Sequence, residues 1–192
     1  RQLLDMGHEV HLIAGKIHVP IDKRIVVHKV PVIKLGRFLK VLSFLLFSQR
    51  VLKKYRFDIV QGFGRTIKQD IFRAGGGCHR EYRKHVLRKI RNPFLRYFRL
   101  CVPHQMLLLY IEKKQFSRGN FRKIVTVSNQ VKKEIISNYP VPEEDIEVIY
   151  NGVDTETFHP GNRERYFTEV RQRFDIQLDK KVILFLGTGF ER

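Results

Sequence analysis

The sequence predicts an α/β fold built on a doubly wound parallel sheet. Short runs rich in Val, Ile and Leu alternate with longer segments whose apolar residues recur at helical spacing. This alternation of strands with helices is typical of a parallel sheet covered by helices. Proline or glycine stands at many of the junctions, where the chain must turn.

Seven short segments are expected to be strands. Residues 8–14 alternate weakly and are rich in Val, Leu and Ile, and residues 24–30 lie between two prolines. Residues 57–63 are a short apolar run typical of a buried strand, and four later segments of the chain are short apolar runs of the same kind. The expected strands, in order, are 8–14, 24–30, 57–63, 70–73, 123–127, 146–150 and 181–186.

The segments between these strands are expected to be helices. Residues 37–55 combine helical spacing with Lys53 and Lys54 in the last turn, where cations favour a helix C-terminus. Ser128 is a good N-cap, and Pro93 and Pro103 divide the long basic segment. The expected helices are the end of one at 1–6, then 37–55, 81–116, 129–139 and 163–174.

The chain has 192 residues, 43% of them hydrophobic, which is enough for one domain or one and a fraction. Arg1 lies in what looks like the end of a helix, and Arg192 comes soon after an apolar strand that no helix covers. We therefore expect a fragment, cut at both ends.

The formal net charge is +18 at pH 7. Such an excess implies an anionic partner: nucleic acid, an acidic membrane surface or a phosphorylated substrate. Cys78 and Cys101 indicate neither a disulfide framework nor a metal site, and no metal-ligand spacing is present. The longest apolar run, at residues 41–47, is far too short to cross a bilayer.

Four loops are candidates for a ligand site, because open parallel sheets bind ligands beyond the carboxyl ends of their strands. Each follows a predicted strand. They are Gly64-Arg65-Thr66, Gly75-Gly76-Gly77, Asn151-Gly152 and Gly187-Thr188-Gly189.

The loop after Arg73 joins three glycines to His79 at the start of a helix. The glycines permit close approach of a ligand, and a histidine there could donate to a phosphate or a sugar hydroxyl. A flexible turn with a surface histidine is the plainer interpretation. The glycine run is not a P-loop, since no Gly-Lys-Ser/Thr follows it.

Two further positions have a plain and a functional interpretation. Asp154 either forms a turn or contacts a ligand. The glycines at 187 and 189 either cradle a phosphate or make an ordinary strand-to-helix turn.

A basic segment follows His79 and holds a single acid, Glu81, among many cations. Apolar residues recur along it at four-residue spacing, from Tyr82 to Phe98. We expect this segment to lie on an anionic membrane surface. Nucleic-acid binding and a solvated surface helix are the alternatives. The expected membrane-surface cations are Arg80, Arg83, Lys84, Arg88, Lys89, Arg91, Arg96 and Arg99.

The ordered pattern VSN…K…I…Y…VIYNGVD…F.P, from Val127 to Pro160, resembles the family-4 retaining glycosyltransferases. GHEVHLI, FDIVQGF and LFLGTGFER extend the resemblance over nearly the whole chain. DIFRAGGGCHREY and the basic helix after it are most similar to the lipopolysaccharide core glucosyltransferase I group. Some relatives carry an Asp where this chain has Gly76.

The resemblance implies the GT-B fold, with two Rossmann-like domains. Residues 1–160 would be the acceptor-side domain without its first strand, and 161–192 the truncated start of the nucleotide-sugar domain. The implied reaction transfers a hexose, expected to be glucose, from a nucleotide sugar such as UDP-glucose to a lipopolysaccharide core or related glycolipid, with retention of configuration. No further cofactor is expected, and the fragment alone should be inactive.

The resemblance also implies roles for single residues. His79 is the expected catalytic residue, and Gly187, Thr188 and Arg192 are expected to bind the donor. The expected acceptor or cleft residues are Arg73, Gly75, Gly76, Asn151, Gly152 and Asp154.

The implied enzyme is cytoplasmic and peripheral on the inner face of the cytoplasmic membrane. Its partners would be the nucleotide sugar, an anionic glycolipid and the anionic membrane surface, and not nucleic acid. Two alternatives stay open: a family-4 enzyme with another polysaccharide or lipid-linked acceptor, and a basic nucleic-acid-binding module.

Overall fold

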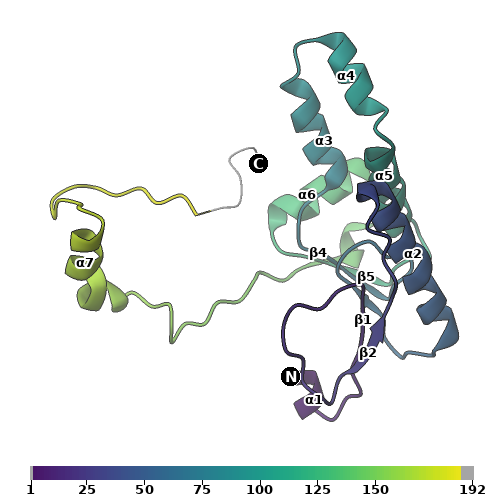
Figure 1. Ribbon diagram of the computed structural model, residues 1–192, viewed down its shortest axis with the longest axis horizontal. Coiled ribbons are helices and arrows are strands. Elements are labelled where there is room, and N and C mark those ends of the chain that lie inside the picture. The colour runs from purple at the N-terminus through teal and green to yellow at the C-terminus, as the bar shows by residue number, and fades with distance from the viewer. Residues whose placement is uncertain (1, 187–192) are drawn as a thin grey trace. The chain divides into compact units, whose positions relative to one another are not determined.

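The computed structural model describes residues 2–186, and its strands pair only in parallel in this range (Figure 1). β1 (His11–Ala14) and β2 (Val26–Lys29) form one sheet. A second sheet has the order β3 (Gln61–Gly62), β4 (Ile71–Ala74), β5 (Lys123–Thr126), β6 (Ile146–Val148). The predicted α/β fold with parallel strands is confirmed, with the strands divided between two hydrogen-bonded sheets.

Helices connect the strands close to where the sequence predicts them. Prolines begin two of these helices, because a residue without an N–H is tolerated in the first turn. Asn92 caps one of the two by accepting hydrogen bonds from the N–H groups of Phe94 and Leu95. The helices are α1 (Gln2–Asp5), α2 (Gly36–Lys54), α3 (His79–Arg88), α4 (Pro93–Leu100), α5 (Pro103–Gln115), α6 (Asn129–Asn138), the 3-10 turn η1 (Glu143–Asp145) and α7 (Asn162–Arg173).

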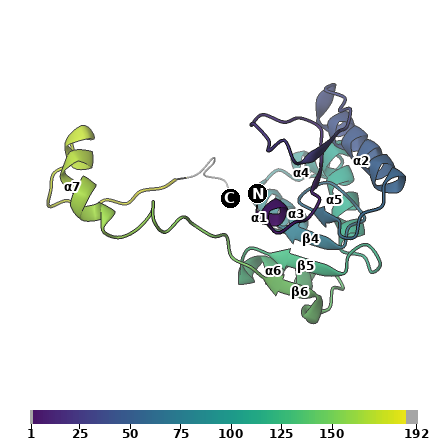
Figure 2. The ribbon, with the colours of Figure 1, turned by 90° about the horizontal axis from the view of Figure 1, so that it is seen from below.

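The main core lies where α6 and Phe116, which directly follows α5, pack on the four-stranded sheet. Figure 2 shows β5 and β6 edge to edge with α6 beside them. Along β5, Ile124 and Thr126 are buried and alternate with less buried positions, as expected for a strand with one face on the core. On α6, Val131 and Ile135 lie four residues apart and point into the same core. The predicted N-cap is confirmed, since Ser128 accepts a hydrogen bond from the Val131 N–H.

The chain divides into an N-terminal unit that runs to Tyr150 and a C-terminal unit that starts at Asn151. The C-terminal unit contains α7, and its described residues include no buried side chain. The predicted boundary at residue 160, and the roles predicted for the two sides, stay predictions.

One predicted strand does not form. Residues 181–186 have no regular structure, and Ile183 is 98% exposed. A strand is held by the backbone hydrogen bonds of a neighbouring strand, and no described residue offers that edge here. The prediction of a strand from apolar composition alone was therefore wrong.

Candidate functional site

The glycine loop leaves the carboxyl end of β4, where a ligand site of a parallel sheet is expected. Gly77 has a φ of +79°, a backbone conformation that favours glycine. A Cβ added to Gly75 or Gly76 would meet nothing within 4 Å, so the space beside both residues is open. Arg73, on β4 just before the loop, is half-buried.

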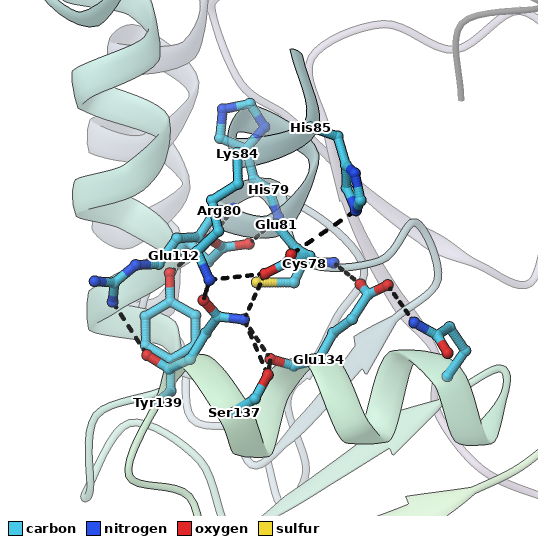
Figure 3. Close-up of polar contacts among 12 residues, drawn as sticks. Cys78, His79, Arg80, Glu81, Lys84, His85, Glu112, Glu134, Ser137 and Tyr139 are labelled. Carbon is cyan, nitrogen blue, oxygen red and sulfur yellow. Dashed lines mark hydrogen bonds and ion pairs between the residues drawn. The ribbon is translucent and has the colours of Figure 1, made fainter. Parts of the chain in front are cut away.

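A buried carboxylate closes the N-terminus of α3. Glu112 lies on α5, is 5% exposed, and accepts hydrogen bonds from the backbone N–H groups of His79 and Arg80 (Figure 3). The Tyr139 hydroxyl donates to the same carboxylate at 2.6 Å. The Cys78 N–H donates to Glu134 on α6 at 3.2 Å. Two carboxylates, on α5 and α6, therefore accept from three successive N–H groups at the start of α3, and Tyr139 holds one of these carboxylates in place.

This arrangement changes the interpretation of the helix terminus. The sequence predicted that His79, at the start of this helix, could donate to a phosphate, and free N–H groups at a helix start would add to such a site. In the structure the N–H groups of Cys78, His79 and Arg80 already donate to Glu134 and Glu112. Any ligand contact in this loop would therefore come from side chains or from the open glycine backbone.

The imidazole of His79 is fixed by α5. Its Nε2 lies 2.8 Å from Oε1 of Gln105, and an amide oxygen only accepts, so Nε2 carries the proton. Burial lowers the pKa of His79 below its ordinary value, and the charges of Arg65 and Arg83 act in the same direction. His79 is therefore neutral at pH 7, with Nδ1 left as an acceptor.

A pocket of about 1160 Å³ lies in the N-terminal unit. Its wall is built where strands end and helices begin: the residues after β1, β2 and β3, the first turns of α2, and the start of α5. Gly15 allows close packing of this wall, because a Cβ there would lie 2.4 Å from a methyl group of Val32. The residues that line it are Gly15, Lys16, Lys29, Val30, Pro31, Val32, Lys34, Arg37, Lys40, Val41, Phe44, Arg65 and His104.

The lining of this pocket contains six Lys or Arg side chains and no carboxylate. Burial lowers the pKa of Arg65, which is half-buried. Burial also lowers the pKa of His104, with further lowering by Arg37 and Arg65. The Nδ1 atom of His104 is buried and has no hydrogen-bond partner among the described residues. The pocket is thus a concave region of positive potential.

The basic segment forms a hairpin of α3 and α4 that extends away from the four-stranded sheet (Figure 1). None of the residues of α4 is buried, and Phe94 and Phe98 are 68% and 58% exposed. Three of the predicted membrane-surface cations contact their own chain: Arg80 donates to the Asn138 carbonyl, Arg83 to the Leu100 carbonyl, and Lys84 to Glu81 and Asn138. Within residues 2–186 the other cations of the set have no polar side-chain partner: Arg88, Lys89, Arg91, Arg96 and Arg99.

The sequence of this chain matches a known protein family. Residues 1–157 match the sequence profile of Glycosyltransferase Family 4. The chain belongs to Glycosyltransferase Family 4. A crystal structure of WaaG, described as a glycosyltransferase involved in lipopolysaccharide biosynthesis, superposes with a TM-score of 0.71 at 19% identity over 92% of this chain and 45% of WaaG. At that identity the likeness shows the GT-B glycosyltransferase fold and leaves the substrate open.

Two curated relatives match shorter segments of this family-4 chain. The uncharacterized glycosyltransferase MJ1607 of Methanocaldococcus jannaschii is 34% identical over 65 residues, which is 34% of this chain and 17% of that protein. Spore coat protein SA of Bacillus subtilis is 36% identical over 70 residues, 34% of this chain and 18% of that protein. The chain therefore spans less than half of WaaG, and its matched segments less than a fifth of these relatives.

The remaining residues predicted for the site of this family-4 chain follow Tyr150 in the sequence. Asn151, Gly152 and Asp154 are exposed. Asp154 accepts hydrogen bonds from the N–H groups of Glu156 and Thr157 and from the Thr157 hydroxyl, so it does form a turn, and a ligand contact stays a prediction. The predicted donor-binding residues Gly187, Thr188 and Arg192 lie outside the described residues.

Sequence reasoning missed the groups that fix His79 and most of the basic pocket. Glu112 and Gln105 are separated from His79 by 33 and 26 positions, so no local pattern connects them. One signal was present: besides Glu81, Glu112 is the sole acid between residues 79 and 116. Arg65 did stand in one of the four predicted loops, but the other pocket cations belong to separate elements.

Among residues 2–186 no three His, Cys, Asp or Glu side chains are grouped closely enough to hold a metal ion. In the same range no helix is long and apolar enough to cross a membrane.

Proposed function

We propose that this protein transfers a hexose from a nucleotide sugar, UDP-glucose in the first instance, to an anionic glycolipid such as a lipopolysaccharide core. The transfer proceeds with retention of configuration and without a cofactor other than the donor. The protein works in the cytoplasm, peripherally on the inner face of the cytoplasmic membrane. Family membership supports the sugar transfer, and the WaaG-like fold supports the division into acceptor and donor sides.

One observation carries the glycolipid part of this proposal. The α3–α4 hairpin exposes aromatic side chains beside cations that have no polar side-chain partner among the described residues. Amphipathic basic helices of this composition bind anionic membranes, with aromatic rings in the interface and cations at the headgroups. The hairpin begins at His79, so membrane contact would bring a lipid-linked acceptor to the glycine loop.

In this reaction the acceptor side of the protein mainly has to hold the acceptor hydroxyl close to the anomeric carbon, and acid–base catalysis is secondary. The acceptor oxygen bonds to the anomeric carbon, the bond from that carbon to the diphosphate breaks, and the proton of the acceptor hydroxyl passes to an oxygen of the departing diphosphate. Neutral His79 offers Nδ1 as an acceptor for a sugar hydroxyl, which orients it for attack. The proposed acceptor contacts are Arg73, Gly75 and Gly76, the proposed cleft residues are Asn151, Gly152 and Asp154, and the proposed donor contacts are Gly187, Thr188 and Arg192.

The test uses the protein expressed from its whole reading frame. Transfer of labelled glucose from UDP-glucose is measured with acceptor glycolipid in anionic vesicles and with the same acceptor in detergent. The F94S/F98S variant should lose at least tenfold in the vesicle assay and little in detergent, because burying each ring in the interface contributes about 1.5–3 kcal/mol. F174S/L178S, which removes exposed apolar residues of the C-terminal unit, is the matched control.

The proposal fails if no nucleotide sugar supports transfer to any glycolipid. It also fails in its membrane part if F94S/F98S binds vesicles as well as the control does. Binding to single-stranded nucleic acid, measured over the same salt series, separates the remaining alternative. A membrane protein retains part of its vesicle binding at high salt through its buried rings, whereas non-specific nucleic-acid binding is lost.

A further inference from the structure

The residues that line the basic pocket of the N-terminal unit have no role in the proposed function. It opens at the carboxyl ends of three parallel strands, since Gly15 follows β1, Val30 follows β2 and Arg65 follows β3. Two helices also begin at its wall, because Arg37 lies in the first turn of α2 and His104 in the first turn of α5. Strand ends and helix starts both favour an anionic ligand in such a position.

The cations of the pocket lack the carboxylate partners that some other cations of the same unit have. Arg24 pairs with Asp5 and Asp22, and Arg122 pairs with Asp70. The pocket cations form no ion pair and no side-chain hydrogen bond within residues 2–186: Lys16, Lys29, Lys34, Arg37, Lys40 and Arg65. Six like charges around one cavity repel one another, so an anion bound among them would be stabilising.

Arg65 is the most buried of the six pocket cations. Its guanidinium is half-buried, and the pKa is lowered because burial disfavours the charged form. Glu112 opposes this effect by its charge, but no hydrogen bond joins the two side chains. A half-buried guanidinium to which no described carboxylate is hydrogen-bonded is suited to bind an anionic group.

We propose that this pocket binds a cluster of two or more phosphate groups carried by the acceptor. The inference rests on the proposed function, because it assigns the phosphates to the acceptor molecule. Six cations match several phosphates better than one, since each phosphate monoester carries about −1.5 to −2 charges at pH 7. The volume, about 1160 Å³, also exceeds the roughly 300–1000 Å³ of ordinary small-ligand pockets.

The placement connects the pocket with the glycine loop. The charge of Arg65 lowers the pKa of His79, so the two side chains lie within electrostatic reach of each other. Phosphates held by the pocket would therefore fix an acceptor whose sugar hydroxyl lies at His79. This is a positioning role, in which the pocket cations hold the acceptor and take no part in bond making.

The first test measures binding of inorganic pyrophosphate to the full chain by calorimetry, with inorganic phosphate for comparison. The variant R37Q/K40Q removes two pocket cations from α2. The variant R50Q/K53Q removes the same residue types and the same charge from the other end of α2, outside the pocket. We expect R37Q/K40Q to weaken pyrophosphate binding at least tenfold and R50Q/K53Q less than twofold, because direct charge-assisted contacts exceed the general field of the protein.

Equal weakening by both double variants would overturn the proposal, because the net charge of the chain would then explain the binding. Absence of pyrophosphate binding by the unaltered chain would overturn it as well. Folding is checked by urea unfolding. R37Q/K40Q should be at least as stable as the unaltered chain, since it relieves repulsion between like charges at exposed positions.

The second test separates the acceptor from the donor as the source of phosphate. Glucose transfer is measured with the phosphorylated glycolipid and with the same glycolipid after phosphatase treatment. R37Q/K40Q should raise the KM for the phosphorylated acceptor about tenfold, leave the KM for UDP-glucose unchanged, and have no effect on the phosphatase-treated acceptor. A raised KM for UDP-glucose alone would assign the pocket to the donor and overturn the proposal.

The two proposals can fail independently. Pyrophosphate binding that depends on Arg37 and Lys40, without any sugar transfer, would leave the phosphate site standing and remove the proposed function. If R37Q/K40Q transfers sugar to the glycolipid as well as the unaltered protein does, the proposed function stands and the proposed phosphate site is wrong.

Discussion

The hydroxyl of Tyr139 donates a hydrogen bond of 2.6 Å to the carboxylate of Glu112, and both side chains are buried. Tyr139 ends α6, whereas Glu112 belongs to α5 and also holds the start of α3. Burial and the neighbouring carboxylate together raise the pKa of Tyr139 well above its ordinary range. The phenol is therefore protonated at neutral pH and acts as the donor.

We predict that Glu112→Gln lowers the free energy of unfolding by about 2–3 kcal/mol, because the buried donors lose a charged acceptor. Tyr139→Phe should cost about 1 kcal/mol, the usual net value of one hydrogen bond. Urea unfolding of the two single variants and the double variant measures the coupling, expected at about 0.5–3 kcal/mol. Strictly additive effects would show that the short contact contributes nothing.

A second prediction concerns acid. The pKa of folded His79 lies below its ordinary value of 6.5, chiefly through burial. The unfolded chain therefore takes up this proton at a higher pH than the folded chain, and stability falls as pH is lowered through 6.5 toward the folded-state pKa. Burial, Arg37 and Arg65 lower the pKa of His104 in the same direction.

Urea unfolding between pH 7.5 and 5 should thus show declining stability, and the slope should be smaller in His79→Gln and smallest in H79Q/H104Q. His159→Gln is the control, since that histidine is exposed in the C-terminal unit. An unchanged slope in H79Q/H104Q would contradict the prediction.

A third prediction distinguishes the two cysteines. Burial and the charge of Glu112 raise the pKa of Cys78 to about 11, and the side chain is 2% exposed, whereas Cys101 is exposed. At pH 8 iodoacetamide should alkylate Cys101 and leave Cys78 intact, because the thiolate is the reactive form. Peptide mapping reads out the sites. Both should react in urea, and early modification of Cys78 in the folded protein would mean that the core at α3 opens readily.

A fourth prediction concerns the turn after the strand β6. The pKa of Asp154 is lowered because the Thr157 hydroxyl and the N–H groups of Thr157 and Glu156 donate to it. Asp154→Ala should remove hydrogen-exchange protection at those two amides. Thr157→Val, which deletes only the hydroxyl, should retain most of it. Equal exchange in all three proteins would show that the turn is held by other contacts.

Much of the fold could be predicted because its signals are local. β5 and α6 lie within one residue of the expected ranges, since apolar period, the Ser128 cap and the prolines all act over a few positions. Residues 181–186 were mispredicted for the opposite reason: whether an apolar run becomes a strand depends on a neighbouring edge, which no local pattern encodes.

The site was only partly predictable for the same physical cause. His79 and the glycine loop stand together in the sequence and could be recognised there. The hydrogen bonds between Glu112 and the start of α3 join positions 32 and 33 residues apart. The pocket cations likewise come from separate elements. Such groups are brought together by packing, and only the folded chain reveals that they act on one ligand.

The start of α3 has a mechanical consequence. Glu112, Glu134 and Tyr139 clamp it to α5 and α6, whereas the far end of the hairpin, at α4, has no buried residue. The hairpin joins α5 on both sides, since Glu112 holds the start of α3 and α4 leads directly into α5, so a force on α4 reaches the start of α3 and α5. In the proposed docking of α4 on a bilayer, the tilt of α4 would set the angle at which the glycine loop faces the lipid, so membrane binding would also orient the substrate.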